Sequence, residues 1–78
     1  MPEVREIQIE MEFIRLDSLL KLCDLVSTGG EAKLWIADGN VRVNGERCLQ
    51  RGKKIYPGDF VATKMTRIRV KRADGYAD

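Results

Sequence analysis

The sequence of 78 residues predicts one small domain that combines short helices with several strands. Three stretches carry this prediction. Residues 4–13 and 64–72 each alternate between apolar and polar side chains, which is typical of strands with one face in water. Between them, residues 28–45 carry the start and stop signals of a helix and then those of a hairpin.

The N-terminal third predicts a strand over residues 4–13 and a first helix over residues 15–26. The apolar side of the strand is expected to hold Ile7, Ile9, Met11 and Phe13. Its other side carries glutamates, which repel phosphates, so we expect this strand to lie away from any nucleic-acid surface. The apolar residues of the helix follow at helical spacing, at Leu16, Leu19, Leu20 and Cys23.

Residues 28–45 hold the densest local signals. Thr28 and Glu31 match a capping box, in which two side chains satisfy free N–H groups at a helix start. We therefore expect a second helix from about residue 29 to residue 37. Gly39 suits the left-handed position that ends a helix, and Asn44-Gly45 is a strong hairpin signal. The apolar face of this helix is expected to hold Ala32, Trp35 and Ile36.

The C-terminal half predicts further strands separated by a basic loop. A strand is expected over residues 46–49, then a polar loop over residues 50–54. Pro57-Gly58-Asp59 predicts a turn, with another strand beginning at residue 60. The last strand, over residues 64–72, has a basic wet face. Whether it joins the main sheet or forms a hairpin with the first strand stays open.

The net charge of +2 conceals an uneven distribution of acidic and basic residues along the chain. Residues 1–40 carry eight acidic and four basic side chains, whereas residues 41–72 carry ten basic and two acidic ones. A half-chain with a net charge of +8 indicates a polyanionic partner, although a merely solvated basic face has the same composition.

Length and composition exclude several classes of function. A chain of this size has little volume for a deep active site. It contains no histidine, no P-loop and no carboxylate pair at catalytic spacing, so we expect no enzyme, no cofactor and no metal site. Cys23 and Cys48 are expected to be reduced thiols. No signal peptide or membrane-spanning run is present, which predicts a soluble cytoplasmic protein.

Two glycines open the second predicted helix, where each costs helix propensity relative to alanine. Gly29 and Gly30 have two explanations. They could let a phosphate approach the N–H groups at the helix start. Alternatively, they could permit close packing against the first helix.

Three motifs in order resemble the S4 RNA-binding domain family. They are Arg15-Leu16-Asp17-x-x-Leu20, then Ala32-x-x-Trp35-Ile36-x-x-Gly39-x-Val41-x-Val43-Asn44-Gly45, then Ile55-x-Pro57-Gly58-Asp59-x-Val61. The small stand-alone bacterial S4-like proteins are the nearest match, through residues 27–33. The resemblance implies an α+β fold with the αL motif, in which two short packed helices lie against a small, mainly antiparallel sheet. It implies a single domain over residues 1–78 with its core motif over about 14–62.

The resemblance also implies where RNA binds. The family presents an arginine on the first helix, matched by Arg15, and a Ser-Arg pair at the second. Thr28 matches the serine, but Gly29 replaces the arginine, and Lys33 could supply part of the lost charge. Basic residues of the hairpin and the following loop complete the predicted site, which consists of Arg15, Thr28, Gly29, Lys33, Arg42, Arg47, Arg51, Lys53 and Lys54.

The sequence therefore predicts a non-catalytic, monomeric module that binds structured RNA, such as ribosomal or another non-coding RNA, through phosphates. It is expected to bind no membrane and no small-molecule substrate. The alternative is an S4-like module that binds protein, with the acidic first strand as its docking edge. A third alternative is a β-grasp sulfur carrier, which can share the Val-Asn-Gly hairpin and the Gly-Asp turn. Such carriers end in Gly-Gly, whereas this chain ends in Gly75-Tyr76-Ala77-Asp78, which argues strongly against this alternative.

Overall fold

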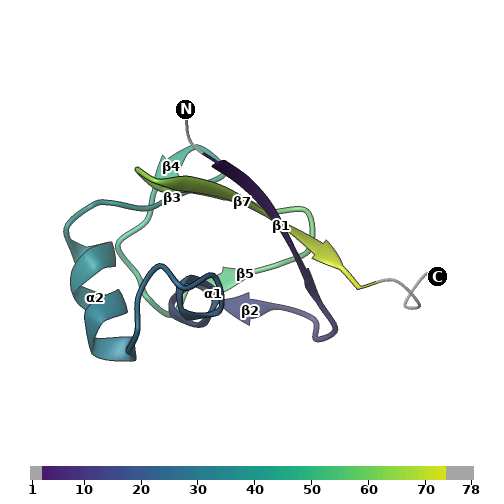
Figure 1. The fold of residues 1–78 in the computed structure, drawn as a ribbon, viewed down its shortest axis with the longest axis horizontal. Helices are drawn as coiled ribbons and strands as arrows, with labels where there is room; N and C mark the ends of the chain where they lie inside the picture. Colours follow the sequence, from purple (N-terminus) through teal and green to yellow (C-terminus); the bar gives the residue numbers. More distant parts are fainter. Residues whose placement is uncertain (1–2, 74–78) are drawn as a thin grey trace.

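The structure is a computed structural model that describes residues 3–73, and the predicted α+β fold is confirmed. Two helices, α1 (Leu16–Leu22) and α2 (Gly29–Ala37), contact each other beside a five-stranded sheet (Figure 1). The strands are β1 (Glu3–Ile9), β2 (Ile14–Arg15), β3 (Arg42–Val43), β4 (Glu46–Arg47), β5 (Lys54–Ile55), β6 (Phe60–Ala62) and β7 (Thr66–Arg72).

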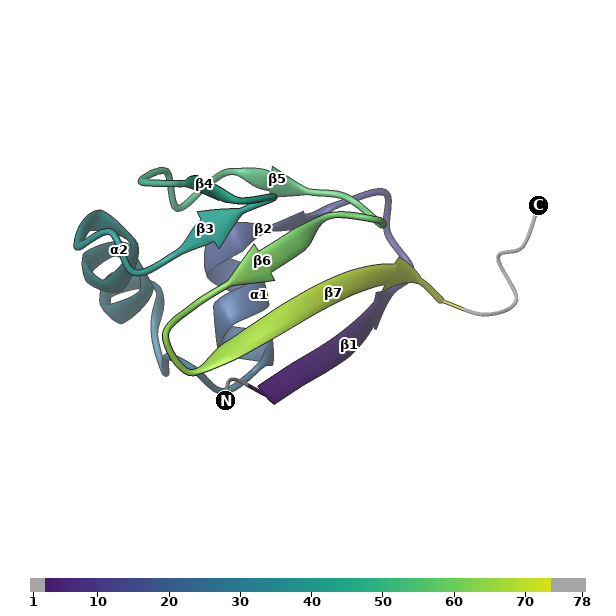
Figure 2. The same cartoon turned by 90° about the horizontal axis from the view of Figure 1, so that it is seen from above.

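The main sheet has the strand order β1-β7-β6-β3-β4, and β2 pairs separately with β5 (Figure 2). All pairings are antiparallel except that of β1 with β7, which is parallel. The last strand therefore joins the main sheet between β1 and β6 and forms no hairpin with the first. β1 is consequently an edge strand of this sheet.

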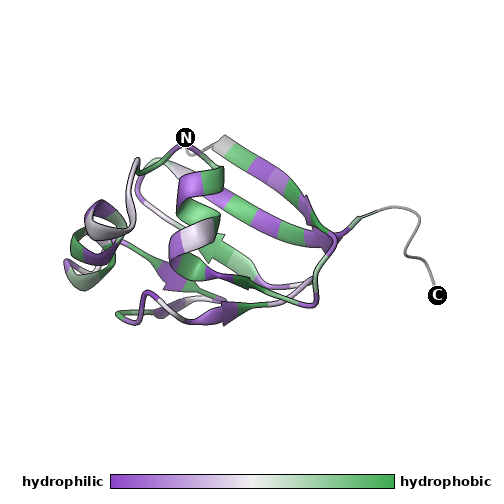
Figure 3. Cartoon of the chain, turned by 90° about the horizontal axis from the view of Figure 1, so that it is seen from below, coloured by the Kyte–Doolittle hydropathy of each residue, from purple (hydrophilic) through white to green (hydrophobic). Residues whose placement is uncertain are grey.

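The core lies between α1 and the inner face of the sheet. Figure 3 shows α1 in front of the sheet, with hydrophobic and hydrophilic bands alternating along the long strands. Leu16, Leu19 and Leu20 of α1 are completely buried against this face. The sheet contributes Val43, Val61, Ile68 and Val70, and Val41, directly before β3, is buried with them.

The first strand is shorter than predicted. β1 ends at Ile9, where Ala73 N–H donates to the Ile9 carbonyl and the register with β7 reaches Arg72. Residues 10–13 leave the sheet, so Met11 is exposed and Phe13 half-buried rather than aligned with Ile7 and Ile9. The prediction of one strand over residues 4–13 was wrong because alternation persists in the sequence beyond the point where a neighbouring strand can pair.

The first helix also ends early, at Leu22 rather than Val26. Asp24 has a φ of 63°, a left-handed conformation that usually calls for glycine. Its N–H donates to the Lys21 carbonyl, and that of Leu25 donates to the Leu20 carbonyl. These two bonds form a Schellman motif, which ends the helix without the glycine that sequence reasoning looks for.

The remaining boundaries follow the local signals closely. α2 covers the predicted residues, with Ala32 and Ile36 buried and Trp35 half-buried against the core. The returning hairpin strand is limited to Glu46–Arg47, and the last strand begins at Thr66 instead of residue 64. Positive φ values occur, as predicted, at Gly39, Gly45 and Gly58.

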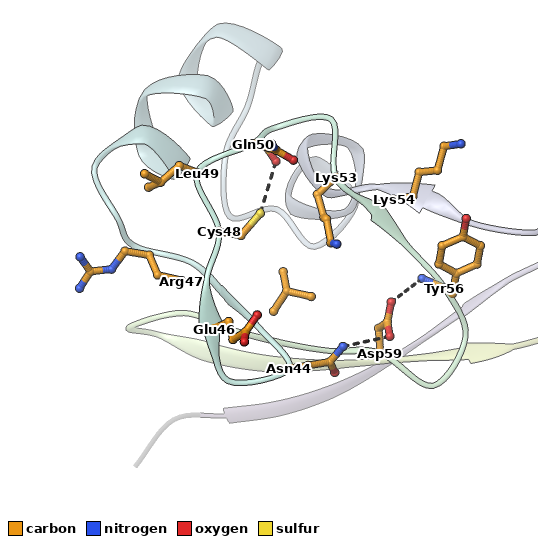
Figure 4. A pocket seen from close by; sticks show the side chains of 11 residues that line it. Asn44, Glu46, Arg47, Cys48, Leu49, Gln50, Lys53, Lys54, Tyr56 and Asp59 are labelled. Carbon is orange, nitrogen blue, oxygen red and sulfur yellow. Dashed lines mark hydrogen bonds between the residues drawn. The ribbon is translucent and has the colours of Figure 1, made fainter.

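Asn44 joins the two turns of the motif. It adopts a φ of 51° in the hairpin, and its side-chain amide donates to Asp59 Oδ1 at 3.1 Å. The Asn44 carbonyl oxygen Oδ1 accepts from Phe60 N–H at 2.9 Å, while Asp59 Oδ2 accepts from Tyr56 N–H at 2.8 Å. The Val-Asn-Gly and Pro-Gly-Asp signatures are therefore one hydrogen-bonded unit in space (Figure 4).

Candidate nucleic-acid interface

Four predicted basic residues meet at the N-terminus of α1. The loop over residues 50–53 covers this helix end, because Leu16 N–H donates to the Lys53 carbonyl and Asp17 N–H to the Arg51 carbonyl, at 2.9 and 3.0 Å. β2 pairs with β5 so that Arg15 lies opposite Lys54. We call the group of Arg15, Arg51, Lys53 and Lys54 the loop cluster; all four are exposed.

Arg15 is held in place by a buried carboxylate. Its Nε and Nη2 atoms donate to Asp17 Oδ1 and Oδ2, both at 3.2 Å, and Asp17 is only 8% exposed. The guanidinium also lies against the loop, since a Cβ added at Gly52 would come within 3.5 Å of Arg15 Nη2. Arg15 keeps 52% of its side chain exposed, so the pair orients a cation that still faces solvent.

Two aromatic rings lie beside the loop cluster. The Phe13 and Tyr56 ring centroids are 5.7 Å apart, and Lys54 Nζ lies 4.9 Å from the Phe13 centroid. Tyr56 is 42% exposed. Unpaired bases stack on such rings next to basic grooves. Sequence reasoning missed both rings: it assigned Phe13 to the first strand, and nothing in the local sequence shows that residue 56 lies next to residue 13.

An open groove of about 480 Å³ runs between the hairpin and β5 (Figure 4). Lys53 and Lys54 line one part of it, and Glu46 and Asp59 line another. Cys48 lies in its wall, and its thiol donates to the Gln50 carbonyl. The groove has mixed charge: Lys53 and Lys54 of the loop cluster border one side of it, and Arg47 also lines it.

The start of α2 follows the C-terminal end of α1, whereas the loop cluster lies at the N-terminus of α1. Thr28 caps the helix as predicted, with its Oγ1 accepting from Glu31 N–H at 3.1 Å. A Cβ added at Gly29 would meet no atom within 4 Å, and one at Gly30 would meet only Thr28 Oγ1, at 3.9 Å. Close packing against the first helix therefore does not explain the two glycines. Lys33 is exposed on the same helix.

Arg42 and Arg47 lie on the face of the main sheet that points away from the core. They are directly opposite each other on β3 and β4, and both are exposed. Arg67 joins them through Ala62, which pairs with Arg42 on one side and with Arg67 on the other. Sequence reasoning found the basic, solvent-facing side of residues 64–72 but missed that Arg67 lies near Arg42, because local alternation does not determine strand order.

The described part of the chain offers no grouping of three or more Cys, Asp or Glu side chains that could hold a metal ion. Neither of its helices is long and apolar enough to cross a membrane.

The paired helices, the Asn-Gly hairpin and the linked Pro-Gly-Asp turn define an S4 domain. A family model described as an S4 domain matches residues 7–71, and the chain belongs to that family. It is similar to the Probable ribosome maturation protein RlbA of Bacillus subtilis (strain 168). The two are 44% identical over 55 residues, which covers 70% of this chain and 78% of that protein. The resemblance to small stand-alone S4-like proteins is thereby confirmed.

Proposed function

We propose that this protein is a non-catalytic module that binds structured RNA, with ribosomal RNA as the first candidate. The observation that carries the proposal is that the Lys53 and Arg51 carbonyl bonds and the pairing of β2 with β5 bring four exposed basic residues to the start of α1. The S4 family is generally RNA-binding, and the name of the relative from Bacillus subtilis refers to ribosome maturation, which supports this choice of RNA.

The loop cluster suits phosphates rather than a small substrate. Arginine and lysine that neutralise phosphates release counterions, which gives affinity with steep salt dependence. A-form RNA hides its base edges in a deep, narrow groove, so recognition relies on phosphates, 2′-hydroxyls and shape. In this proposal Phe13 and Tyr56 stack on an unpaired base next to the contacted phosphates, because they lie within reach of Lys54.

The start of α2 has a smaller role in the proposal, and we call Thr28, Gly29 and Lys33 the α2 corner. The free space at Gly29 lets a phosphate oxygen approach the first N–H groups of the helix, which Thr28 caps through Glu31 N–H, and Lys33 adds one charge. The protein acts as a cytoplasmic monomer without a cofactor, metal or small-molecule substrate.

The test is equilibrium binding of a labelled ribosomal RNA fragment at several salt concentrations. Replacing Arg51, Lys53 and Lys54 with glutamine removes three exposed charges of the loop cluster. A matched control replaces Lys21, Lys71 and Arg72, which are also exposed, with glutamine. We expect the first variant to reduce the slope of log affinity against log salt by about 2–3, since each phosphate contact contributes about 0.7–0.9. Equal affinities for the two variants would contradict the loop-cluster assignment.

A second candidate function is a protein-binding module, and one observation favours it. β1 is an edge strand with Val4, Glu6 and Gln8 exposed, so an extended peptide could add to the sheet there. The absence of the family arginine at Gly29 fits weakened RNA binding. This candidate predicts that wild-type protein binds the RNA fragment no better than the triple loop variant does.

A further inference from the structure

The open face of the main sheet carries three arginines in one cross-strand row. The pairing register places Arg47 opposite Arg42, Arg42 opposite Ala62, and Ala62 opposite Arg67. We call Arg47, Arg42 and Arg67 the arginine row. Neighbouring strands lie about 4.8 Å apart, so Arg42 and Arg67 are separated by about 10 Å across the small Ala62. The three arginine side chains therefore leave the same face of the sheet in one row, and all three are exposed.

The arginine row has no carboxylate partner among the described residues, although Arg42 Nη1 donates to the Gly45 carbonyl at 3.4 Å, whereas its neighbours on the same face lie beside Glu6. Like charges directly opposite each other destabilise a sheet, and Arg42 and Arg47 stand in that arrangement. Within residues 3–73 no ion pair involves any of the three. By contrast, Arg69 lies opposite Glu6 and 6.0 Å from the Phe60 ring, and Lys71 Nζ is 3.8 Å from Glu6 Oε1.

A depression of about 310 Å³ lies at one end of the arginine row. Arg42, Arg47 and Lys64 line it, and no acidic side chain does. Gly39 leaves room for Arg47 there, because an added Cβ would lie 3.4 Å from the Arg47 side chain. Three cations around a hollow without a carboxylate match the needs of a phosphate group, which arginine can contact with two parallel hydrogen bonds.

Arg42 and Arg67 lie on the side of the sheet that faces away from the loop cluster, whereas Arg47, on the edge strand β4, also lines the groove bordered by Lys53 and Lys54. α1, whose start carries the loop cluster, covers the inner face (Figure 3), whereas Arg42 and Arg67 point away from the core. Figure 2 shows the sheet with α1 behind it. An RNA segment bound beside α1 therefore does not extend along the arginine row unless the RNA chain folds around the sheet edge.

We propose that the arginine row is a second RNA-binding surface, which holds the backbone of a separate RNA segment with one phosphate between Arg42, Arg47 and Lys64. This inference rests on the proposed RNA-binding function and extends it: the domain joins two RNA segments, one on each side of its sheet. Recognition at the arginine row is through phosphates, since the hollow beside it is lined by three cations and no acidic side chain.

The test counts bound RNA by native mass spectrometry, with full-length protein and an excess of a synthetic RNA stem-loop. We expect wild-type protein to form a complex with two stem-loops. The double variant Arg42→Gln/Arg67→Gln should bind one, with the second binding event weakened by about tenfold or more. The matched control Arg69→Gln/Lys71→Gln removes two charges from the same face, where Glu6 already compensates, and should still bind two.

The outcomes separate this inference from the proposed function. Suppose that wild-type protein binds a single stem-loop, and that this complex is lost in Lys53→Gln/Lys54→Gln but kept in Arg42→Gln/Arg67→Gln. This result overturns the second surface and leaves the proposed function intact. Two bound stem-loops in the Arg42→Gln/Arg67→Gln variant also overturn it. If wild-type protein binds no stem-loop, both proposals fail. Thermal unfolding of each variant checks folding, and removal of the opposed Arg42 charge is expected not to lower the melting temperature.

Discussion

Arg15 and Asp17 form a bidentate ion pair at the start of α1, with both N–O distances at 3.2 Å. Asp17 Oδ1 also accepts from Ser18 N–H at 2.8 Å, so one buried carboxylate serves the helix end and the arginine together. The N-terminus of α1 favours this negative charge. The pair thus connects the fold to the loop cluster, since Asp17 N–H is itself bonded to the Arg51 carbonyl.

Asp17→Asn should therefore destabilise the protein by about 1–3 kcal/mol, because it weakens charge-assisted hydrogen bonds at a buried position. The coupling with Arg15→Gln in a double-mutant cycle should be about 0.5–1 kcal/mol, since half of the Arg15 side chain is in water. Urea unfolding measures both values. Asp38→Asn, at an exposed helix end, is the control and should change stability by less than about 0.5 kcal/mol. A coupling of zero would show that the Arg15–Asp17 pair contributes nothing to stability.

Asn44→Asp tests the connection between the two turns. The new carboxylate can still accept from Phe60 N–H, but it faces Asp59 where the Asn44 amide used to donate. Loss of that bond and like-charge repulsion should destabilise the variant by about 1–3 kcal/mol at neutral pH. Acidification towards about pH 4 protonates carboxyls and should recover part of this loss relative to wild type. A penalty that does not change with pH would contradict the close approach of residues 44 and 59.

Two substitutions at Gly29 test its effects on folding stability and on RNA binding separately. Gly29→Ala should raise the free energy of unfolding by up to about 1 kcal/mol, because the added Cβ meets no atom and alanine favours the helix. Gly29→Arg restores the charge found in the wider family. Relative to Gly29→Ala, it should tighten RNA binding by about threefold to tenfold and steepen the salt slope by about 0.7–0.9. Unchanged RNA affinity would exclude the α2 corner from the interface.

The two cysteines should differ in reactivity. Burial raises the pKa of the Cys23 thiol above its ordinary 9.0, although the nearby Arg5 guanidinium lowers it in part. Cys48 lies in the open groove. At about pH 8, iodoacetamide should therefore label Cys48 well before Cys23, because the thiolate is the reactive form. Mass spectrometry of the two cysteine-containing peptides measures the labelling rates. Similar rates for Cys23 and Cys48 would contradict the buried position of Cys23.

The raised pKa of Cys23 also predicts a pH dependence of stability. The folded state holds the thiol proton more tightly than the unfolded state, so this stabilisation is complete below the unfolded pKa of about 9 and is lost above it. Between about pH 9 and pH 10, wild-type stability should fall relative to Cys23→Ala by up to about 1.4 kcal/mol per pH unit. Cys48→Ala is the matched control and should track wild type.

Local signals in the sequence were sufficient for the elements that local chemistry controls. The capping box at Thr28, the left-handed glycine at position 39 and the hairpin at Asn44 each depend on neighbours a few residues away. The end of α1 was missed because Asp24 takes a conformation that sequence reasoning reserves for glycine. The end of β1 was missed because the strand stops where its partner stops, and pairing is a property of distant residues.

The candidate interface was likewise predictable from the sequence only in part. The basic loop over residues 50–54 was evident from composition, but its position beside Arg15 was not predicted, because it depends on the pairing of β2 with β5. The Phe13–Tyr56 contact and the arginine row were not predictable, because each depends on which distant segments the fold brings together. Arg42 and Arg47 were therefore grouped with the loop cluster, although the sheet places Arg42 on its other face and Arg47 on an edge strand next to both surfaces.

The most direct test of the central claim is ultraviolet crosslinking in cells, followed by sequencing of the RNA bound to the intact protein. This crosslinking joins only groups in contact, so it reports direct binding rather than association through a partner. The account predicts enrichment of one or a few structured RNA segments, with reduced recovery when Arg51, Lys53 and Lys54 are replaced with glutamine. Recovery of no RNA above background would contradict RNA binding and favour a protein partner at the edge strand β1.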